Sequence, residues 1–166
     1  MPRGDYFSVR IRGVDRTIRN LAKTSDAVLE AARAGCNEAG EHLLDAVKGK
    51  FGRYNSTGGP PGGYGSWPKL KYETKAKKLS KYGRDAGPLV ASGKTVSSLH
   101  LKEAGKGRLA ASVTADSSYL IHHVYGAPGA NVPMRDPMRV TALEEKEACH
   151  KIILEHIEGA IRKEGL

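Results

Sequence analysis

Apolar and polar residues alternate along the first segment of the chain. From Tyr6 to Val14, an apolar residue at every second position is separated from the next by serine or arginine. A period of two residues is typical of a strand with one buried face. The pattern therefore predicts a strand that ends at Gly13. Shorter apolar runs at 89–90, 96–101 and 108–114 are also predicted to be strands, the last two joined as a hairpin at Gly105–Lys106–Gly107.

Two other stretches have the spacing of long helices. Apolar residues recur every three or four positions from Val28 to Phe51, which predicts an amphipathic helix of roughly 25 residues that ends at Gly52. Gly35 and Gly40 lie inside this helix, where each costs about 1 kcal/mol relative to alanine. They indicate close packing of another element against that face, with a mild kink as the alternative. A second long helix is predicted from about Pro137 or Thr141 to Lys163.

Shorter helices and irregular segments complete the pattern. A basic helix is predicted after Trp67 and ends at Gly83, and another begins at Ser117 or Ser118 and ends at Gly126. Together these elements predict a single α+β domain over residues 1–166, with an antiparallel sheet of about four to five strands packed against two long helices. Between the elements lie a glycine- and proline-rich loop at 52–68 and a proline-rich loop at 127–137.

The loop at 52–68 needs an explanation because connections longer than about 12 residues are usually functional or disordered. It contains no GxxxxGK[ST] phosphate loop, and no strand leads a GxGxxG into a helix. We interpret it as a mobile loop that orders when a neighbouring subunit or partner docks. A plain disordered linker is the alternative.

Charge narrows the classes of partner. The chain has 39% hydrophobic and 27% charged residues, so it is expected to fold, and its formal net charge is +9. One basic stretch lies near the N-terminus. A second forms a candidate basic surface in the middle of the chain, comprising Lys69, Lys71, Lys75, Lys77, Lys78, Lys81 and Arg84. Such a surface suits DNA phosphates, an acidic protein partner or a solvated helix face.

No pattern of residues argues for catalysis, a cofactor or a metal. Adjacent His122 and His123 on a helix point about 100° apart, and His150 and His156 lack the i,i+4 spacing of a zinc-binding helix. Cys36 and Cys149 have no neighbouring metal-ligand spacing and are expected to be buried, reduced thiols. Neither a signal peptide nor an apolar run of roughly 20 residues is evident, so we expect a cytosolic protein with no membrane contact.

The order of several short motifs carries a resemblance. Trp67-Pro68-Lys69-Leu70 precedes a lysine-rich helix with Thr74, and Pro88 to Gly93 then forms an L-x-x-[ST]-G turn. Tyr119 to Gly126 is similar to a Y-A-x-x-H-x-x-G helix, and Val132 to Met138 to a [IV]-P-x-R-x-[FP] loop. Over residues 67–143 this order resembles the tail-completion, or head-tail joining, proteins of tailed bacteriophages. Leu120 and the Asp136-Pro137-Met138 run depart from the family pattern, which leaves the subfamily open.

The resemblance implies a structural virion protein. It implies a sheet flanked by helices and assembly into a homo-oligomeric ring, often of six copies, in the neck or at the head-proximal tail end. Its partners would be tail-tube or connector proteins, and the ring lumen could pass close to DNA without specific binding. The protein would be found in the host cytoplasm during assembly and then in the virion. The alternatives are a basic DNA-binding accessory protein and, with less support, a toxin-like or nuclease domain.

Five residues in or beside the two loops are candidate contacts to a subunit or partner. Arg135 is a fixed cation that could clamp a neighbour's carboxylate, although an intrachain pair with Asp136 or a helix carboxylate is the alternative. Trp67, the only tryptophan, anchors its loop to the core or contributes to an interface. The complete set of candidates is Tyr64, Trp67, Met134, Arg135 and Met138.

Overall fold

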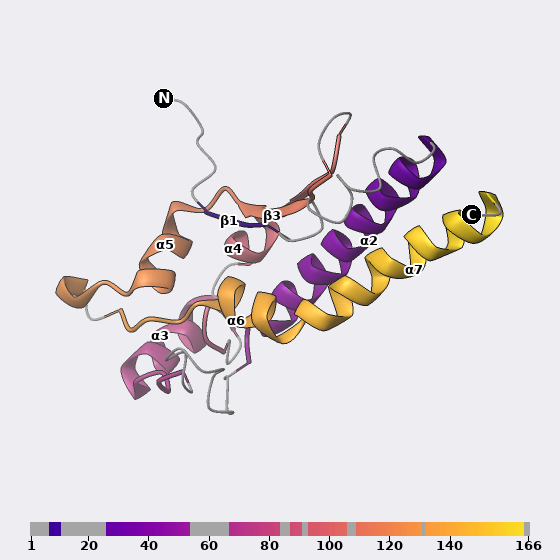
Figure 1. Ribbon diagram of the computed structural model, residues 1–166. Coiled ribbons are helices and arrows are strands. Elements are labelled where there is room, and N and C mark those ends of the chain that lie inside the picture. The colour runs from indigo at the N-terminus through magenta and orange to yellow at the C-terminus, as the bar shows by residue number, and fades with distance from the viewer. Residues whose placement is uncertain are drawn as a thin grey trace, which may run out of the picture.

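Two long helices run side by side through the molecule, and a small sheet packs on another side of the first of them (Figure 1). The computed structural model describes residues 7–10, 26–53, 67–83, 87–90, 93–105, 109–130 and 132–164. In chain order the described elements are β1 (Phe7–Arg10), α2 (Asp26–Lys50), α3 (Tyr72–Tyr82), α4 (Lys94–Ser97), β2 (Leu99–Lys102), β3 (Ser112–Ala115), α5 (Ser118–Tyr125), the 3-10 turn η1 (Pro128–Ala130), α6 (Pro137–Glu144) and α7 (Lys146–Glu164).

Helix α2 is the central element, and two of its three glycines, Gly35 and Gly40, explain why. A Cβ atom built on Gly35 would lie 3.0 Å from the Cα atom of Ile153 in α7. One built on Gly40 would lie 2.6 Å from Cδ1 of Leu101 in β2 and 3.0 Å from Cβ of Ala111. The absence of a side chain at Gly35 therefore lets α7 pack closely against α2, and its absence at Gly40 does the same for the sheet. The predicted long helix and the close packing at both glycines are confirmed.

The sheet has three short antiparallel strands in the order β1-β3-β2. Strand β3 is central: Val113 is the partner of Val9 in β1 and of Leu101 in β2. All four residues of β3 are buried, as expected for the middle strand of a covered sheet. The predicted hairpin of β2 and β3 is confirmed, although residues 106–108 of its connection lie outside the described part.

The predicted fold class, an α+β fold with about four to five strands packed against two long helices, is wrong. The described part of the chain is mostly helical, with six α-helices and four-residue strands. The expected strand at 89–90 is absent, because Leu89 lies in a turn with φ 64°. The expected strand at 96–101 begins only at Leu99, because Val96 lies in α4, which begins after Gly93 at φ 81°. Apolar residues form a strand only where a neighbouring strand is available, and a local turn prevails at Leu89 and a short helix at Val96.

The second long helix is also interrupted. The carboxylate of Asp136 accepts hydrogen bonds from the backbone N–H groups of Met138 and Arg139, both at 3.0 Å, and so caps the start of α6. Pro137 occupies the first turn, where its missing N–H costs nothing. The helix is interrupted at Glu145, and α7 then runs from Lys146 to Glu164. Because Asp136 caps the helix and Pro137 follows it directly, the helix begins at Pro137 and not at Thr141.

The core forms where α2, α7 and the sheet meet. Both cysteines are buried there as thiols, and burial raises the pKa of the Cys149 thiol, as expected for an inert side chain. Two His–Glu contacts join the helices at their surface: His42 Nε2 lies 2.8 Å from Glu145 Oε2, and His156 Nε2 lies 2.7 Å from Glu38 Oε2. None of the helices in the described ranges combines the length and apolar character needed to cross a membrane.

The glycine packing gives a stability prediction. Gly35→Val should lower the free energy of unfolding by about 1–3 kcal/mol, because the added carbons must push the backbone of α7 away. Gly49→Val is the matched control, since a Cβ at Gly49 has nothing within 4 Å; it should change stability by less than about 0.5 kcal/mol. Urea unfolding followed by circular dichroism measures both variants, and equal effects would contradict the packing role of Gly35.

Candidate functional site

The motif segment that begins at Pro88 packs against the turn after α2. The backbone N–H of Gly52 donates a hydrogen bond to the carbonyl of Pro88 at 2.9 Å. Gly87 lies so close to Gly52 that an added Cβ would fall 1.9 Å from the Gly52 carbonyl oxygen. The segment 87–90 is thus pressed directly against the turn that follows α2. Only a residue without a side chain fits at position 87.

Lys78 ties α3 to this segment. Its ammonium group donates to the carbonyl oxygens of Gly87 at 2.7 Å and Val90 at 2.6 Å. Charge-assisted hydrogen bonds of this kind are stronger than neutral ones, at about 1.5–3 kcal/mol each. They also hold the turn that contains Leu89 in its unfavourable left-handed conformation. Lys78 is therefore a structural cation.

Arg135 ties the proline-rich loop to neighbouring segments, as Lys78 ties α3 to the segment 87–90. Its side chain is 3% exposed, and its guanidinium donates to the carbonyl of Pro68 at 2.7 Å. Its backbone N–H donates to the carbonyl of His123 at 2.5 Å. One residue thereby connects the chain after Trp67, helix α5 and the start of α6. Its observed contacts lie within the chain.

His123 completes a group that we call the cationic junction: Lys78, His123 and Arg135. The ring of His123 lies in α5, and its Nδ1 atom is buried with no hydrogen-bond partner among the described residues. Burial, followed by the charges of Arg135, Lys78 and His122, lowers the pKa of His123 to about 4. The imidazole is therefore neutral at physiological pH. The permanent positive charges of Lys78 and Arg135 disfavour a further positive charge on the imidazole of His123.

The side-chain donors of the junction are engaged in hydrogen bonds between chain segments. The donors of Lys78 and Arg135 are directed at the backbone carbonyls of Gly87, Val90 and Pro68, in partly buried hydrogen bonds. Burial raises the pKa of the adjacent Asp136 carboxyl, although the N–H groups of Arg139 and Met138 oppose this shift. Within the described ranges, no group of three or more His, Cys, Asp or Glu side chains could hold a metal ion.

The structure places most candidate contact residues inside the molecule. Trp67 is 6% exposed and belongs to the core, and Met138 is a fully buried residue of α6. Arg135 is internal as well, whereas Met134 is 46% exposed and remains available for a contact. Tyr64 lies outside the described residues. The motifs therefore mark how the domain is held together more than where a partner binds.

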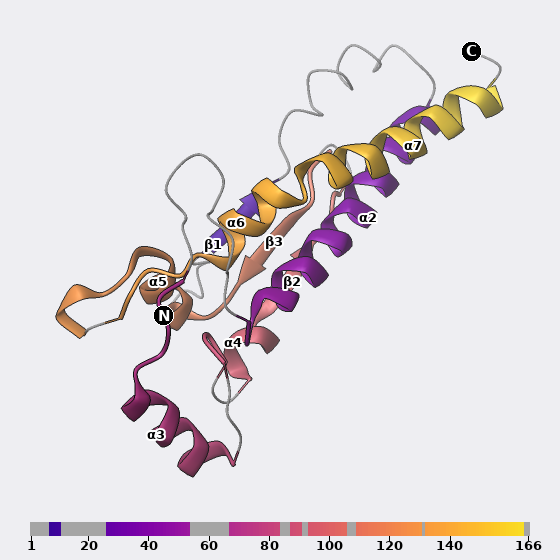
Figure 2. The ribbon, with the colours of Figure 1, turned by 90° about the horizontal axis from the view of Figure 1, so that it is seen from below.

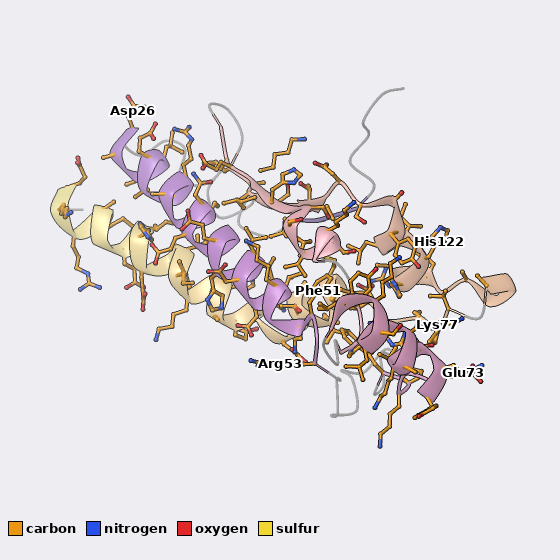
Figure 3. All side chains as sticks on the ribbon, turned by 180° about the vertical axis from the view of Figure 1, so that it is seen from behind. Asp26, Phe51, Arg53, Glu73, Lys77 and His122 are labelled. Atoms are coloured by element: carbon orange, nitrogen blue, oxygen red, sulfur yellow. The ribbon has the colours of Figure 1, made fainter. Side chains whose placement is uncertain are left out.

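The candidate basic surface is divided between the interior and the solvent. Lys69, Lys71, Lys77 and Lys81 are exposed, and Lys75 is half-buried. Lys78 belongs to the junction, and Arg84 lies outside the described residues. Figure 3 shows Lys77 and Glu73 on α3 at the end of the molecule that also carries His122, with Asp26 far away at the start of α2.

Exposed apolar residues at this same end were not identified from the sequence. Tyr72 and Leu79 on α3 are 85% and 55% exposed, and Tyr119 and Tyr125 on α5 are 63% and 66% exposed. Tyr72 and Leu79 lie seven residues apart and so share one helix face. That periodicity was the available signal, but the many lysines around it made α3 resemble a simply solvated helix.

The proline-rich loop is closed on itself. Ala127 and Val132 form a bridge, with Ala127 N–H donating to Val132 O at 2.8 Å and Val132 N–H donating to Ala127 O at 3.1 Å. Gly126, at φ 74°, makes the turn that starts it. The exposed tip at 129–130 projects from the end of the molecule (Figure 1). Residues 54–66 of the other predicted contact loop lie outside the described part.

Comparisons of the chain with protein-family models, with curated proteins and with solved structures gave no match.

The internal role of Arg135 predicts a stability effect. Arg135→Met keeps the length of the side chain but removes the donor to the Pro68 carbonyl, so it should lower the free energy of unfolding by about 2–3 kcal/mol. Arg162→Met is the control, because this arginine is exposed on α7 and its ion pair with Glu158 lies in solvent; it should cost less than about 0.5 kcal/mol. Chemical denaturation measures both variants. An Arg135→Met protein as stable as the control would exclude the junction as a structural tie.

The low pKa of His123 predicts a pH dependence. Between about pH 6.5 and pH 4 the unfolded chain takes up a proton at this residue that the folded chain does not, so folding stability falls as the pH falls through this window. After allowing for its partial exposure, the loss should be about 1–2 kcal/mol. The measured quantity is the difference in unfolding free energy between the natural protein and His123→Gln, from pH 7.5 to 4.

Taking this difference removes the contributions of the carboxyl groups, including Asp136. The difference should decline with acidification and level off near pH 4. His122→Gln, the exposed neighbour on the same helix, controls for the loss of an imidazole ring. A difference for His123→Gln that stays flat across the window would show that folding does not lower the pKa of this ring.

Proposed function

We propose that this chain is a structural virion protein of a tailed bacteriophage. It forms a ring at the neck or the head-proximal end of the tail, completes or terminates the tail, and joins it to the head. The proposal begins from the ordered motifs between Trp67 and Met138, which resemble tail-completion proteins. It assigns the protein no catalytic activity.

One observation lends this proposal its main support: the four motif segments come together in a single structural unit. Hydrogen bonds of Arg135 join the segment after Trp67, helix α5 and the loop before α6. Hydrogen bonds of Lys78 join α3, which follows the first of these segments, to the turn at 87–90. Short motifs that matched by chance would have no reason to be linked in this way. The resemblance therefore concerns a connected part of the domain.

A ring also needs a surface that the single chain leaves uncovered. Tyr72, Leu79, Tyr119, Tyr125 and Met134 are all large, apolar and exposed, and they lie on α3, α5 and the following loop. Exposed apolar patches on soluble proteins commonly mark interaction sites. Figures 1 and 2 both place these elements at one end of the molecule, away from the far end of the α2–α7 pair.

The assembly test uses the purified full chain. We expect light scattering coupled to size-exclusion chromatography, together with negative-stain images, to show a closed ring, either alone or after addition of tail-tube or connector proteins. A chain that stays monomeric and binds neither partner would refute the proposal. Copy number comes directly from the mass, because a ring of six differs clearly from a dimer.

DNA binding is the second candidate, favoured by the exposed lysines of α3 and the residues before it. This function predicts that affinity for duplex DNA falls steeply as salt rises, with a slope near −0.9 per phosphate contact. Lys71→Glu combined with Lys77→Glu and Lys81→Glu should then abolish binding, whereas Lys78 must be left intact because it holds the turn at 87–90. A ring whose formation is unaffected by added DNA would favour the structural function.

A further inference from the structure

Helix α3 is amphipathic but buries none of its residues. Its apolar face consists of Tyr72, Ala76 and Leu79, which helical spacing places on one side. No described element packs extensively against this helix, and Lys78 provides its described hydrogen bonds to the 87–90 segment. An 11-residue helix of this kind is marginal in water by itself, so its exposed apolar face needs a reason.

The surroundings of this face are strongly positive. Residues 67–83 contain six lysines and a single acidic residue, Glu73. The occupant of the face must therefore tolerate a high local positive potential, and opposite charge across an interface both speeds association and excludes wrong partners. A purely apolar partner would leave the positive charges of these lysines without opposite charges across the interface.

The same chain carries a surface of opposite charge. Glu38, Glu41 and Asp45 are exposed and follow one another at spacings of three and four residues, so they line the outward side of α2. Glu144 and Glu145 adjoin them, because Glu145 contacts His42 and Glu144 contacts Lys50. Leu143 beside them is 46% exposed. We call this group the acidic ridge: Glu38, Glu41, Asp45, Glu144 and Glu145.

We propose that α3 of one copy of the chain docks through Tyr72, Ala76 and Leu79 onto the acidic ridge of a second copy. The exposed Leu143 meets the apolar face of α3, and the carboxylates meet the lysines. Glu38, Glu144 and Glu145 already contact His156, Lys50 and His42 within the chain. Glu41 and Asp45 are exposed and have no ion pair among the described residues, so these two carboxylates carry the proposed contact with the lysines. The inference rests on the ring-forming function proposed above and assigns its subunit interface.

Charge also selects the mode of association. A twofold contact of α3 with α3 would bring together the lysines of both copies, and like charges at an interface are costly. Contact between two different surfaces avoids this repulsion. Such a head-to-tail contact repeats from copy to copy and closes into a ring when the rotation between neighbours allows it.

The test measures subunit affinity by sedimentation velocity on the full chain. Leu79→Ala and the double variant Lys71→Glu/Lys75→Glu should each weaken assembly at least about tenfold, a loss typical of a central contact. Leu154→Ala and Lys163→Glu are matched controls at exposed positions of α7, outside both surfaces, and should assemble normally. Circular dichroism verifies that every variant keeps the fold.

Exchanging the charges of the two surfaces provides the decisive experiment. Adding Glu41→Lys and Asp45→Lys to Lys71→Glu/Lys75→Glu reverses both surfaces together and should restore assembly to within about threefold of the natural chain. Failure of this rescue, or α3 variants that assemble as well as the controls, would overturn the proposed interface while leaving the ring intact. A natural chain that never assembles would overturn the proposed function instead.

Discussion

The arrangement depends on how closely α7 and the sheet approach α2. At Gly35 the backbone of α7 comes within van der Waals contact of α2, and at Gly40 the side chains of β2 and its neighbour Ala111 do the same. Each glycine lowers helix propensity, so the close packing that it permits must return more than about 1 kcal/mol. α2 is thereby fixed between two layers. The turn after its last residue becomes the fixed point for the segment 87–90.

From that point onward the domain is held by cations as much as by apolar contacts. Lys78 and Arg135 direct their charges at carbonyl groups of chain segments that have no regular partner strand. A three-stranded sheet leaves many loops, and buried loop carbonyls must find donors. Long basic side chains supply these donors from neighbouring elements. Two of the charges that give the chain its basic character thus act inside the molecule.

The sequence located the long helices and the β2–β3 hairpin but predicted too many strand residues, for a physical reason. A helix satisfies its own hydrogen bonds, so the spacing of α2 and the glycine end of α3 were sufficient to locate them. A strand depends on a neighbour that lies far away in the sequence, and Leu89 and Val96 resembled strand residues without having one. The break at Glu145 was not predicted because both sides of it carry helical periodicity. The candidate contact residues show the same limit: Trp67 and Arg135 were chosen as loop residues suited to interfaces, yet distant elements pack around both.

The way α3 is attached suits it for docking. Lys78 fixes the helix to the 87–90 turn, and the left-handed Gly83 closes its end with a hydrogen bond to Leu79 at 2.8 Å. Its orientation is thus set before any partner arrives, which reduces the entropy that binding must overcome. The apolar face meanwhile stays uncovered. A helix held by charge and free on its apolar side can bind a neighbour without giving up contacts within its own chain.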